Sequence, residues 1–251
     1  MGLSNLAAII LAAGKGTRLK SPLAKVLQPL AGQPLLSYVL QAVRPLKPGA
    51  TIAVIGYQAE QVREAFQGEA DLQYVLQAEQ LGTGHAAAQA KEVLQEFSGD
   101  LLILCGDMPF IRTETLQEML SLRQSTKAAC VMLSFIDPEN QDFGRVVRGE
   151  DGSVDRIVEM RDATEQEKRV DELNAGVYCF EKELFFKALD KLDNQNAQNE
   201  YYLTDTIHLL KCEGLRVDSV LAKDTREVFG INSLDDLNKA ERMVADFHPF
   251  E

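Results

Sequence analysis

The chain has 251 residues, of which 45% are hydrophobic and 25% are charged, and its formal net charge is −12. A chain of this length buries enough surface to fold without disulfides or a structural metal. The negative balance argues against non-specific binding to nucleic acid or to an anionic membrane. The four cysteines form no C-x-x-C pair, and no apolar run is long enough to cross a bilayer. We therefore expect a cytoplasmic protein with reduced thiols and with no nucleic-acid or membrane partner.

The first 125 residues alternate between short apolar runs and helical patterns. Apolar runs without internal alternation are typical of strands buried on both faces of a parallel sheet. Their alternation with helices predicts an α/β fold in which helices cover that sheet. The expected strands are residues 6–13, 51–55, 72–76 and 101–104, and the expected helices are residues 34–46, 58–66 and 86–97.

The pattern becomes richer in strands after about residue 125. Asp151-Gly152 is a strong hairpin signal between two of these strands. Ser233, followed by Asp236, is a typical helix N-cap for the last helix. No repeat or linker is visible, which favours one compact domain. The expected strands are residues 128–135, 145–148, 154–159 and 176–180, and the expected helices are residues 201–210 and 233–247.

A glycine loop, Gly14 to Arg18, follows the first buried strand. Glycines at such a strand end let the backbone approach a ligand and direct N–H groups toward phosphate oxygens. The loop is neither a dinucleotide fingerprint, which needs glycine where Leu19 stands, nor a P-loop, which needs glycine where Ile9 stands. A tight turn with solvated side chains is the alternative interpretation. The cations Arg18 and Lys25 favour a phosphate site.

A second candidate segment follows the third expected strand and reads QAEQLGTGHA over residues 77–86. Its Gly82-Thr83-Gly84 turn can press against a flat ring or a phosphate, and Gln77 and Gln80 can pair with the edge of a base. His85 opens the next helix, and we interpret this lone histidine as structural rather than catalytic.

Asp107 lies in the segment Cys105-Gly106-Asp107 at the end of the fourth expected strand. An aspartate capping a turn is one interpretation. The carboxyl ends of parallel strands meet at one sheet edge, so Asp107 is also expected near the glycine loop. A carboxylate beside phosphates is a natural ligand for Mg²⁺, and this second interpretation is favoured.

These three segments together resemble the sugar-phosphate nucleotidylyltransferases. The resemblance extends over nearly the whole chain and is greatest to the uridylyltransferase half of the bacterial bifunctional N-acetylglucosamine-1-phosphate uridylyltransferases. The glycine loop is shared by many sugar nucleotidylyltransferases, whereas QLGTGHA and NAQNEYYLTD are more specific to this branch. The matching segments are residues 11–19, 77–86, 106–109, 143–148, 157–163, 173–178, 196–205 and 228–232.

The resemblance implies a role for individual positions on the nucleotide side. Two cations, Arg18 and Lys25, would be the catalytic residues and would bind the phosphates of nucleotide and sugar. Two oxygen ligands, Asp107 and Asn232, would hold Mg²⁺. The implied nucleotide-binding residues are Leu11, Ala12, Ala13, Gly14, Gly16, Thr17, Gln77, Gln80, Gly82 and Thr83.

On the sugar side, the resemblance implies a pocket for N-acetylglucosamine in which Glu159 accepts hydrogen bonds from sugar hydroxyls. From the residues alone, Glu159 and Asn174 are ordinary polar residues at strand ends. The implied sugar-binding residues are Gly144, Glu159, Asn174, Tyr202 and Thr204.

The implied fold is the Rossmann-like pyrophosphorylase fold, with a mostly parallel central sheet flanked by helices and a β-rich sugar-binding portion. We expect one nucleotidylyltransferase domain over residues 1–251, with a nucleotide-binding portion (1–125), a sugar-binding portion (126–232) and a C-terminal helix (233–251). No β-helix acetyltransferase domain is expected, and the oligomeric state stays open. Ala24 departs from the proline that the family usually carries there, which predicts a less rigid loop before Lys25.

The implied reaction forms UDP-N-acetylglucosamine, a precursor of peptidoglycan and lipopolysaccharide, and pyrophosphate from UTP and N-acetylglucosamine 1-phosphate. A sugar 1-phosphate is already an anion at neutral pH, so Mg²⁺ and cationic side chains suffice for an in-line attack without a covalent intermediate. Two alternatives stay open. One is a nucleotidylyltransferase for another sugar or base, and the other is a sensor that binds nucleotide sugars without turnover.

Overall fold

The computed structural model describes residues 5–138 and 143–246 of the chain. Within these residues, one nine-stranded sheet runs through the molecule and a two-stranded hairpin lies apart from it. The strands of the sheet are β1 (Leu6–Ala12), β4 (Ala50–Ile55), β5 (Leu72–Leu76), β6 (Asp100–Cys105), β7 (Cys130–Ile136), β8 (Arg145–Arg148), β9 (Val154–Val158), β10 (Glu172–Glu181) and β11 (Val217–Leu221), and the hairpin consists of β2 (Pro29–Leu30) and β3 (Gln33–Pro34).

The main path of the sheet has the strand order β11-β7-β10-β6-β1-β4-β5. β1 pairs in parallel with β4 and β6, β4 with β5, and β7 with β11. β10 runs antiparallel to its neighbours β6 and β7. The prediction of a mostly parallel central sheet is confirmed, and strands from the second half of the chain extend the sheet that the first half begins. β8 and β9 form the hairpin predicted at Asp151-Gly152, where Gly152 has a φ of 76°.

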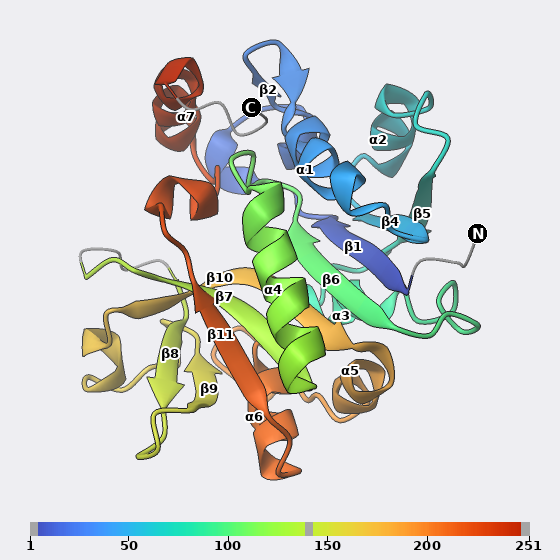
Figure 1. Cartoon of the computed structure of the whole chain (residues 1–251). Helices are drawn as coiled ribbons and strands as arrows, with labels where there is room; N and C mark the ends of the chain where they lie inside the picture. Colours follow the sequence, from blue (N-terminus) through green and yellow to red (C-terminus); the bar gives the residue numbers. More distant parts are fainter. Residues whose placement is uncertain (1–4, 139–142, 247–251) are drawn as a thin grey trace.

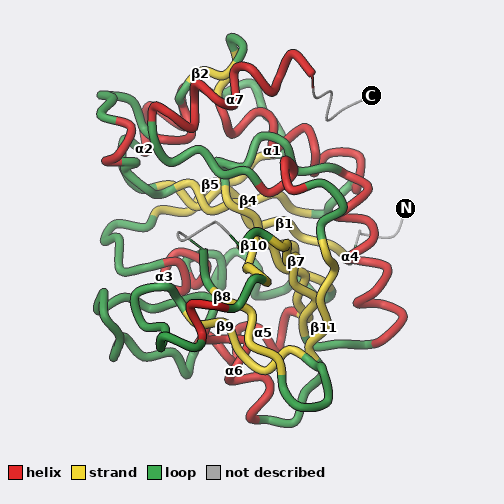
Figure 2. Tube along the Cα trace, turned by 90° about the vertical axis from the view of Figure 1, so that its left-hand side faces the viewer, coloured by secondary structure: helices red, strands yellow, loops and turns green. Residues whose placement is uncertain are grey.

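Helices cover both faces of this sheet. α1, α2 and α4 pack on one face and α3, α5 and α6 on the other, while α7 packs with the β2–β3 hairpin. Figure 1 shows α4 crossing in front of the strands, and Figure 2 shows the strands between α4 and α3. Among the described residues, no helix combines the length and apolar character that spanning a bilayer requires. The helices are α1 (Leu35–Val43), α2 (Ala59–Ala65), α3 (Thr83–Ala88), α4 (Thr113–Thr126), α5 (Lys182–Leu189), α6 (Asp205–Cys212) and α7 (Leu234–Asp246).

The hydrophobic core is divided by the sheet into two layers. Along β1, Ala8 and Ile10 point to the layer under α1 and α4, while Ala7 and Ile9 point to the layer under α3 and α5. This alternation follows from the two-residue period of a strand. It explains why the sequence of β1 is apolar at every position, because both of its faces are buried.

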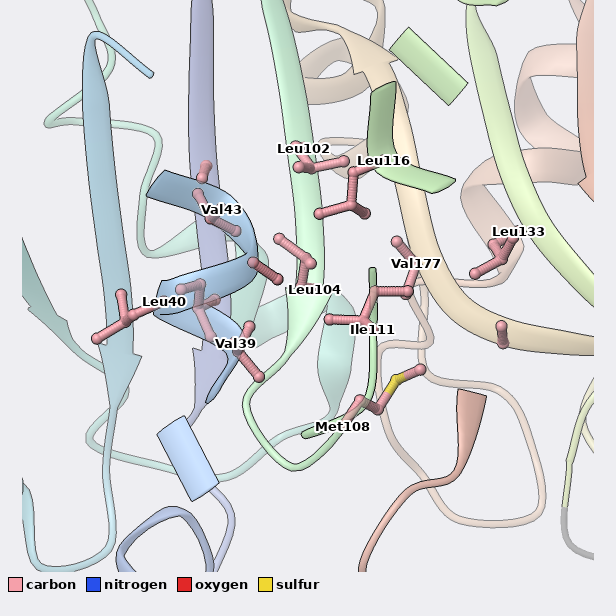
Figure 3. Close-up of a cluster of buried hydrophobic side chains, with 14 of the residues drawn as sticks. Val39, Leu40, Val43, Leu102, Leu104, Met108, Ile111, Leu116, Leu133 and Val177 are labelled. Atoms are coloured by element: carbon pink, nitrogen blue, oxygen red, sulfur yellow. The ribbon is translucent and has the colours of Figure 1, made fainter. Parts of the chain in front are cut away.

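The layer under α1 and α4 is drawn in Figure 3. Val39 and Val43 of α1 and Leu116 of α4 pack toward Leu102 and Leu104 of β6. Each of these five residues is at most 1% exposed to solvent. This packing holds β6 rigidly, and the residues that follow β6 lead into the candidate site.

The helix predicted over residues 86–97 is wrong in its extent. α3 begins earlier, at Thr83, and ends at Ala88, after which the chain continues in turns. The side chain of Gln89 donates a hydrogen bond to the backbone oxygen of His85, and the Gln89 N–H bonds to Ala86 instead. Side-chain competition for a helical carbonyl is a recognised reason for a helix to end.

The helix predicted from residue 201 instead begins at Asp205. The backbone of Tyr201 is already paired with the segment near Gly82, since its N–H donates to Leu81 and its carbonyl accepts from Gly84. A residue whose backbone groups bond to a distant segment cannot supply them to a helix. α4, α5 and β11 were not predicted from the sequence.

The capping prediction for the last helix is confirmed. The Ser233 N–H donates to Asp236 Oδ2 at 2.8 Å, and the Asp236 N–H donates to Ser233 Oγ at 3.2 Å. This reciprocal pair is a capping box with aspartate in place of the usual glutamate. Phe247, the predicted last residue of the helix, lies outside the described residues.

We expect Arg123→Met to destabilise the protein. Arg123 on α4 forms an ion pair with Asp100 at the start of β6, and the side chain of Asp100 is only 5% exposed. Loss of the guanidinium would leave a buried carboxylate without its cation, which costs about 3–5 kcal/mol of unfolding free energy. Urea denaturation measures this loss. The double change with Asp100→Asn should recover part of it, and a single variant as stable as the parent would contradict the interpretation.

Candidate active site

The predicted site residues gather at one edge of the sheet, where β1, β4, β5 and β6 end. Two cavities of about 350 and 240 Å³ open there side by side. The two cavities adjoin, because four residues line both of them. The shared lining residues are Leu11, Thr83, Cys105 and Asp107.

The larger cavity, which we name the β1 cavity, contains most of the residues predicted to bind nucleotide. Gly16 and Thr17 do not line it. The lining residues are Leu11, Ala12, Ala13, Gly14, Lys25, Val26, Gln77, Gln80, Gly82, Thr83, Ala86, Cys105, Asp107 and Glu200.

Gly14 and Gly16 differ in what surrounds them. Gly14 is exposed at the cavity and has open space where a Cβ would stand. Gly16 has a φ of 66°, and a Cβ there would lie 2.8 Å from Cβ of Lys25. Gly16 therefore lets the loop fold tightly over Lys25. Thr17 begins a 3₁₀ turn and is exposed.

Gln77 is held in one orientation by its neighbours. Its amide nitrogen lies 3.1 Å from the backbone oxygen of Gly82 and 3.1 Å from Nδ1 of His85. The carbonyl of Gly82 only accepts, so it holds the amide nitrogen on this side and leaves the carbonyl oxygen of Gln77 as the group that can meet a ligand. The structural interpretation of His85 agrees with this contact, since the imidazole orients Gln77.

The Gly82–Gly84 turn is joined to the segment around Tyr201. A Cβ on Gly82 would lie 2.6 Å from the backbone oxygen of Tyr201, and one on Gly84 would lie 2.5 Å from Leu192. The hydroxyl of Thr83 accepts a hydrogen bond from Leu203 N–H at 3.0 Å. These glycines are therefore required by close backbone packing, and only Gly82 of the pair also lines the β1 cavity.

Lys25 lies where the two cavities meet. Its ammonium forms an ion pair with Asp107 and donates to Asn232 Oδ1 at 2.6 Å. The side chains of Lys25 and Asp107 are each 15% exposed. The structure thus brings together one predicted catalytic residue and both predicted metal ligands, which come from three separate parts of the chain.

The smaller cavity, which we name the β10 cavity, contains Gly144, Glu159, Asn174 and Thr204 of the predicted sugar site. Tyr202 does not line it. The full lining is Leu11, Thr83, Cys105, Asp107, Met108, Phe143, Gly144, Glu159, Asn174, Ala175, Gly176, Tyr178, Leu203, Thr204, Val228, Gly230 and Asn232.

Polar contacts fix the side chains of this cavity. Thr204 Oγ1 donates to Glu159 Oε1 at 3.0 Å, and Asn174 Nδ2 donates to the hydroxyl of Tyr178 at 2.7 Å. Burial raises the pKa of Glu159, and the hydrogen bond from Thr204 opposes that shift. Gly144 permits the chain to approach β9 closely, since a Cβ there would lie 2.9 Å from Cγ2 of Ile157.

Asn174 reaches the cavity because β10 is irregular. The register of β10 against β7 shifts between Asn174 and Tyr178, and Gly176 within this bulge has a φ of 75°. Bulges commonly redirect side chains beside functional sites. The sequence pattern cannot show such a shift, because a strand pattern predicts continuous pairing.

Tyr202 supports the β10 cavity from behind. Its hydroxyl accepts from Gln198 at 2.9 Å and donates to Asp162 at 3.3 Å, and the residue is 5% exposed. Asp162 in turn accepts from Ala197 N–H at 2.8 Å. Tyr202 therefore connects the turn after β9 to the NAQNEYYLTD segment rather than facing the cavity.

Arg18 lines a third cavity of about 380 Å³ next to the β10 cavity. The two cavities share Phe143, Val228, Gly230 and Asn232. Arg18 is exposed and lines this third cavity together with Asn232, whereas Lys25 lines the β1 cavity. The two predicted cations thus do not share one cavity.

Cys105 lies in the wall between the cavities but is not a nucleophile. Burial, with a smaller contribution from Asp107, raises the pKa of its thiol to about 12. The reactive thiolate is therefore absent at neutral pH. Among the described residues, no cluster of three or more His, Cys, Asp or Glu could hold a metal.

Several lining residues were missed by the sequence interpretation, including Glu200, Phe143 and Tyr178. Glu200 lies inside the NAQNEYYLTD segment and Phe143 beside Gly144, so both adjoin a predicted motif. Tyr178 looks like an ordinary core tyrosine in a strand. Only its hydrogen bond from Asn174 distinguishes it, and no sequence signal predicts that contact.

Comparisons with known proteins show the family of this chain. The chain is 48% identical over 240 residues to the bifunctional protein GlmU of Geobacter sulfurreducens, covering 96% of this chain and 50% of that protein. It is 45% identical over 239 residues to GlmU of Geobacillus thermodenitrificans, covering 95% of this chain and 52% of that protein. The chain therefore spans about half the length of the curated relatives it matches.

A solved structure of UDP-glucose pyrophosphorylase complexed with UDP-glucose has the same fold, with a TM-score of 0.77 at 17% identity. The match covers 96% of this chain and 99% of that one. This confirms the predicted pyrophosphorylase fold. Residues 8–199 match the MobA-like NTP transferase domain, and the chain therefore belongs to this family of nucleotidyltransferases.

Proposed function

We propose that the protein forms UDP-N-acetylglucosamine and pyrophosphate from UTP and N-acetylglucosamine 1-phosphate. The observation that carries the proposal is the junction of two cavities at Lys25, Asp107 and Asn232. The β1 cavity suits the nucleotide and the β10 cavity suits the sugar. Reacting phosphates would then meet at the ammonium of Lys25.

The fixed orientation of Gln77 supports uracil as the base. Its carbonyl oxygen is the acceptor that can face a base, because the amide nitrogen donates to the backbone oxygen of Gly82. Uracil presents an N3–H donor to such an acceptor, whereas cytosine presents an acceptor at N3. A cytosine would place two acceptors against each other, and a buried unpaired acceptor costs binding energy.

The chemistry of the β10 cavity supports a sugar rich in hydroxyls. Glu159 offers carboxylate oxygens, and Asn174 has its amide nitrogen committed to Tyr178. Charged acceptors bind hydroxyl groups more strongly than neutral acceptors do. The preference for the N-acetylglucosamine ring rests on the names of the similar proteins and on the QLGTGHA and NAQNEYYLTD segments.

Asp107 and Asn232 fit a divalent cation. Carboxylate and amide oxygens are hard ligands of the kind that Mg²⁺ takes, and one or two protein ligands suffice when phosphates supply others. Both oxygens already converge on one cation, the ammonium of Lys25. Bound Mg²⁺ would neutralise charge on the phosphates.

The chain's own residues would act by binding and alignment. A phosphate oxygen of the sugar 1-phosphate forms a bond to the α-phosphorus of UTP, and the bond from that phosphorus to pyrophosphate breaks. The attacking oxygen is already an anion, so no general base is required. Lys25 and Arg18 offset the negative charge, which is how phosphoryl-transfer sites work in general.

Similarity to the two GlmU proteins supports this reaction over another sugar nucleotidylyltransferase. The presence of Lys25, Asp107 and Asn232 together supports turnover over a sensor role. The sequence change at Ala24 is the only feature that favours a sensor.

A substrate panel tests the proposal. The protein is incubated with Mg²⁺, each ribonucleoside triphosphate or dTTP, and a set of sugar 1-phosphates, and pyrophosphate release is measured. UTP with N-acetylglucosamine 1-phosphate should react fastest, and excess EDTA should stop the reaction until Mg²⁺ is restored. Preference for another pair would overturn the substrates, and release with none of the pairs would overturn the reaction.

Lys25→Ala should lower kcat far more than it raises KM for UTP. Its ammonium stands at the junction, and losing one charge-assisted contact that strengthens in the transition state costs about 10²–10³ in rate. Steady-state kinetics with UTP varied separate the two constants. A change in KM alone would make Lys25 a uniform binding contact and remove it from catalysis.

Glu159→Gln should raise KM for the sugar phosphate roughly 10-fold near pH 8, because hydrogen bonds to a charged acceptor exceed those to a neutral one by that order. Burial raises the pKa of Glu159, so the parent's carboxylate becomes protonated as the pH falls through that raised value. The ratio of the two KM values should then fall toward one at lower pH. The substrate phosphate titrates equally in both measurements, so its effect cancels in the ratio. A ratio that does not change with pH would contradict the role of Glu159 as a charged acceptor for the sugar.

A further inference from the structure

Gln58 adopts a backbone conformation that glutamine rarely takes. It precedes α2 with φ 52° and ψ 40°, in the left-handed region. A non-glycine residue there is strained relative to the right-handed form. Such strain persists where surrounding contacts hold it, and it is a reason to ask what the side chain does.

The side chain of Gln58 uses both ends of its amide on one distant loop. Oε1 accepts from the Ala24 N–H at 2.6 Å, and Nε2 donates to the backbone oxygen of Pro22 at 2.7 Å. The amide therefore pairs with the loop as a neighbouring strand would. Gln28 adds a third contact, donating to the backbone oxygen of Leu23 at 3.1 Å.

This loop leads directly into Lys25. Ala24 is fully buried, and its carbonyl accepts from Leu27 N–H at 2.9 Å to begin the 3₁₀ turn that carries Lys25. A shift of the Ala24 peptide would therefore move the Lys25 side chain relative to Asp107.

The backbone next to Gln58 is fixed to the sheet edge. The Tyr57 N–H donates to the backbone oxygen of Ala13 at 3.1 Å, which joins the end of β4 to the end of β1. Gly56 permits this approach, since a Cβ there would lie 2.9 Å from Cβ of Ala13. Gln58 thus connects the loop before Lys25 to the edge that forms the β1 cavity.

We infer that Gln58 is a positioning residue, whose amide holds the Pro22–Ala24 backbone so that Lys25 is aimed at the junction of the two cavities. The expected effect of Gln58 on kcat rests on the proposed function. Gln58 does not line the β1 cavity, the β10 cavity or the third cavity that contains Arg18. It therefore acts through Ala24 and not on substrate.

Gln58→Gly separates positioning from stability. Glycine relieves the left-handed strain, which offsets part of the stability lost with the amide contacts, so the midpoint of urea unfolding should shift only slightly. kcat should fall roughly 10-fold with KM for UTP nearly unchanged, because misplacing a catalytic group by a fraction of an ångström has effects of this order. Lys127→Gly is the matched control. Lys127 is exposed with a φ of 53° at the end of α4, so this variant relieves similar strain and should keep the parent's kcat.

Ala24→Pro tests the same contact from the other side. Proline lacks the N–H that Gln58 accepts, but its ring fixes the loop at the φ of −53° that Ala24 already adopts. Alone it should leave kcat equal or somewhat higher, because the stiffer loop no longer needs this contact. In that background Gln58→Gly should cost much less than the roughly 10-fold expected in the parent. An equal loss in both backgrounds would overturn the inference, as would a Gln58→Gly variant with the parent's kcat.

Hydrogen exchange of the Ala24 amide, followed by NMR, needs no turnover. Exchange should be faster in Gln58→Gly than in the parent or in Lys127→Gly, because the acceptor is lost. Unchanged exchange would overturn the inference. If the parent released no pyrophosphate in the substrate panel, the proposed function would fail while this measurement would still decide whether Gln58 holds the loop.

Discussion

One ammonium group joins the parts of the chain that form the site. Lys25 reaches Asp107 after β6 and Asn232 before α7, and the latter is separated from it by 207 residues in sequence. The backbone supports the same meeting point, since Ile231 N–H donates to the backbone oxygen of Asp107 at 3.0 Å. The ammonium is held between a carboxylate and an amide oxygen and so brings three segments of the chain together. Residues of these segments line the two cavities. The position of the remaining site residues follows from this convergence.

Convergence of this kind requires glycine at the crossing points. A Cβ on Gly106 would lie 3.0 Å from Val26 and 3.2 Å from the backbone oxygen of Leu11, so β1, β6 and the Lys25 turn could not approach as they do. Gly16 permits the glycine loop to fold over Lys25 in the same way. The glycines of this site therefore act mainly by letting protein segments meet, and the space left for phosphates is a consequence of that packing.

The sheet was predictable because β1, β4 and β6 are largely apolar runs, as packing on both faces requires. The convergence of Asp107 with the glycine loop was also predictable, since parallel strands end at one edge. Asn174 and Tyr202 could not be placed in this way. The first depends on a bulge in β10 and the second on a hydrogen bond to Asp162, and neither leaves a local pattern. The meeting of QLGTGHA with NAQNEYYLTD, through Gly84 and Tyr201, likewise depends on pairing between distant segments.

The distribution of charge across the cleft explains how a protein with a net charge of −12 could bind two polyanions. Lys25 and Arg18 line two neighbouring cavities, whereas Glu159 of the β10 cavity has the carboxylates of Asp205 and Asp162 near it. Burial is the main cause that raises the pKa of Asp205 to about 6, and the negative charges of Asp193 and Asp162 add to it. For the proposed substrates, phosphates would be repelled from that end, while neutral sugar hydroxyls could donate to Glu159. These carboxylates would then orient the sugar phosphate, with its ring toward them and its phosphate toward Lys25.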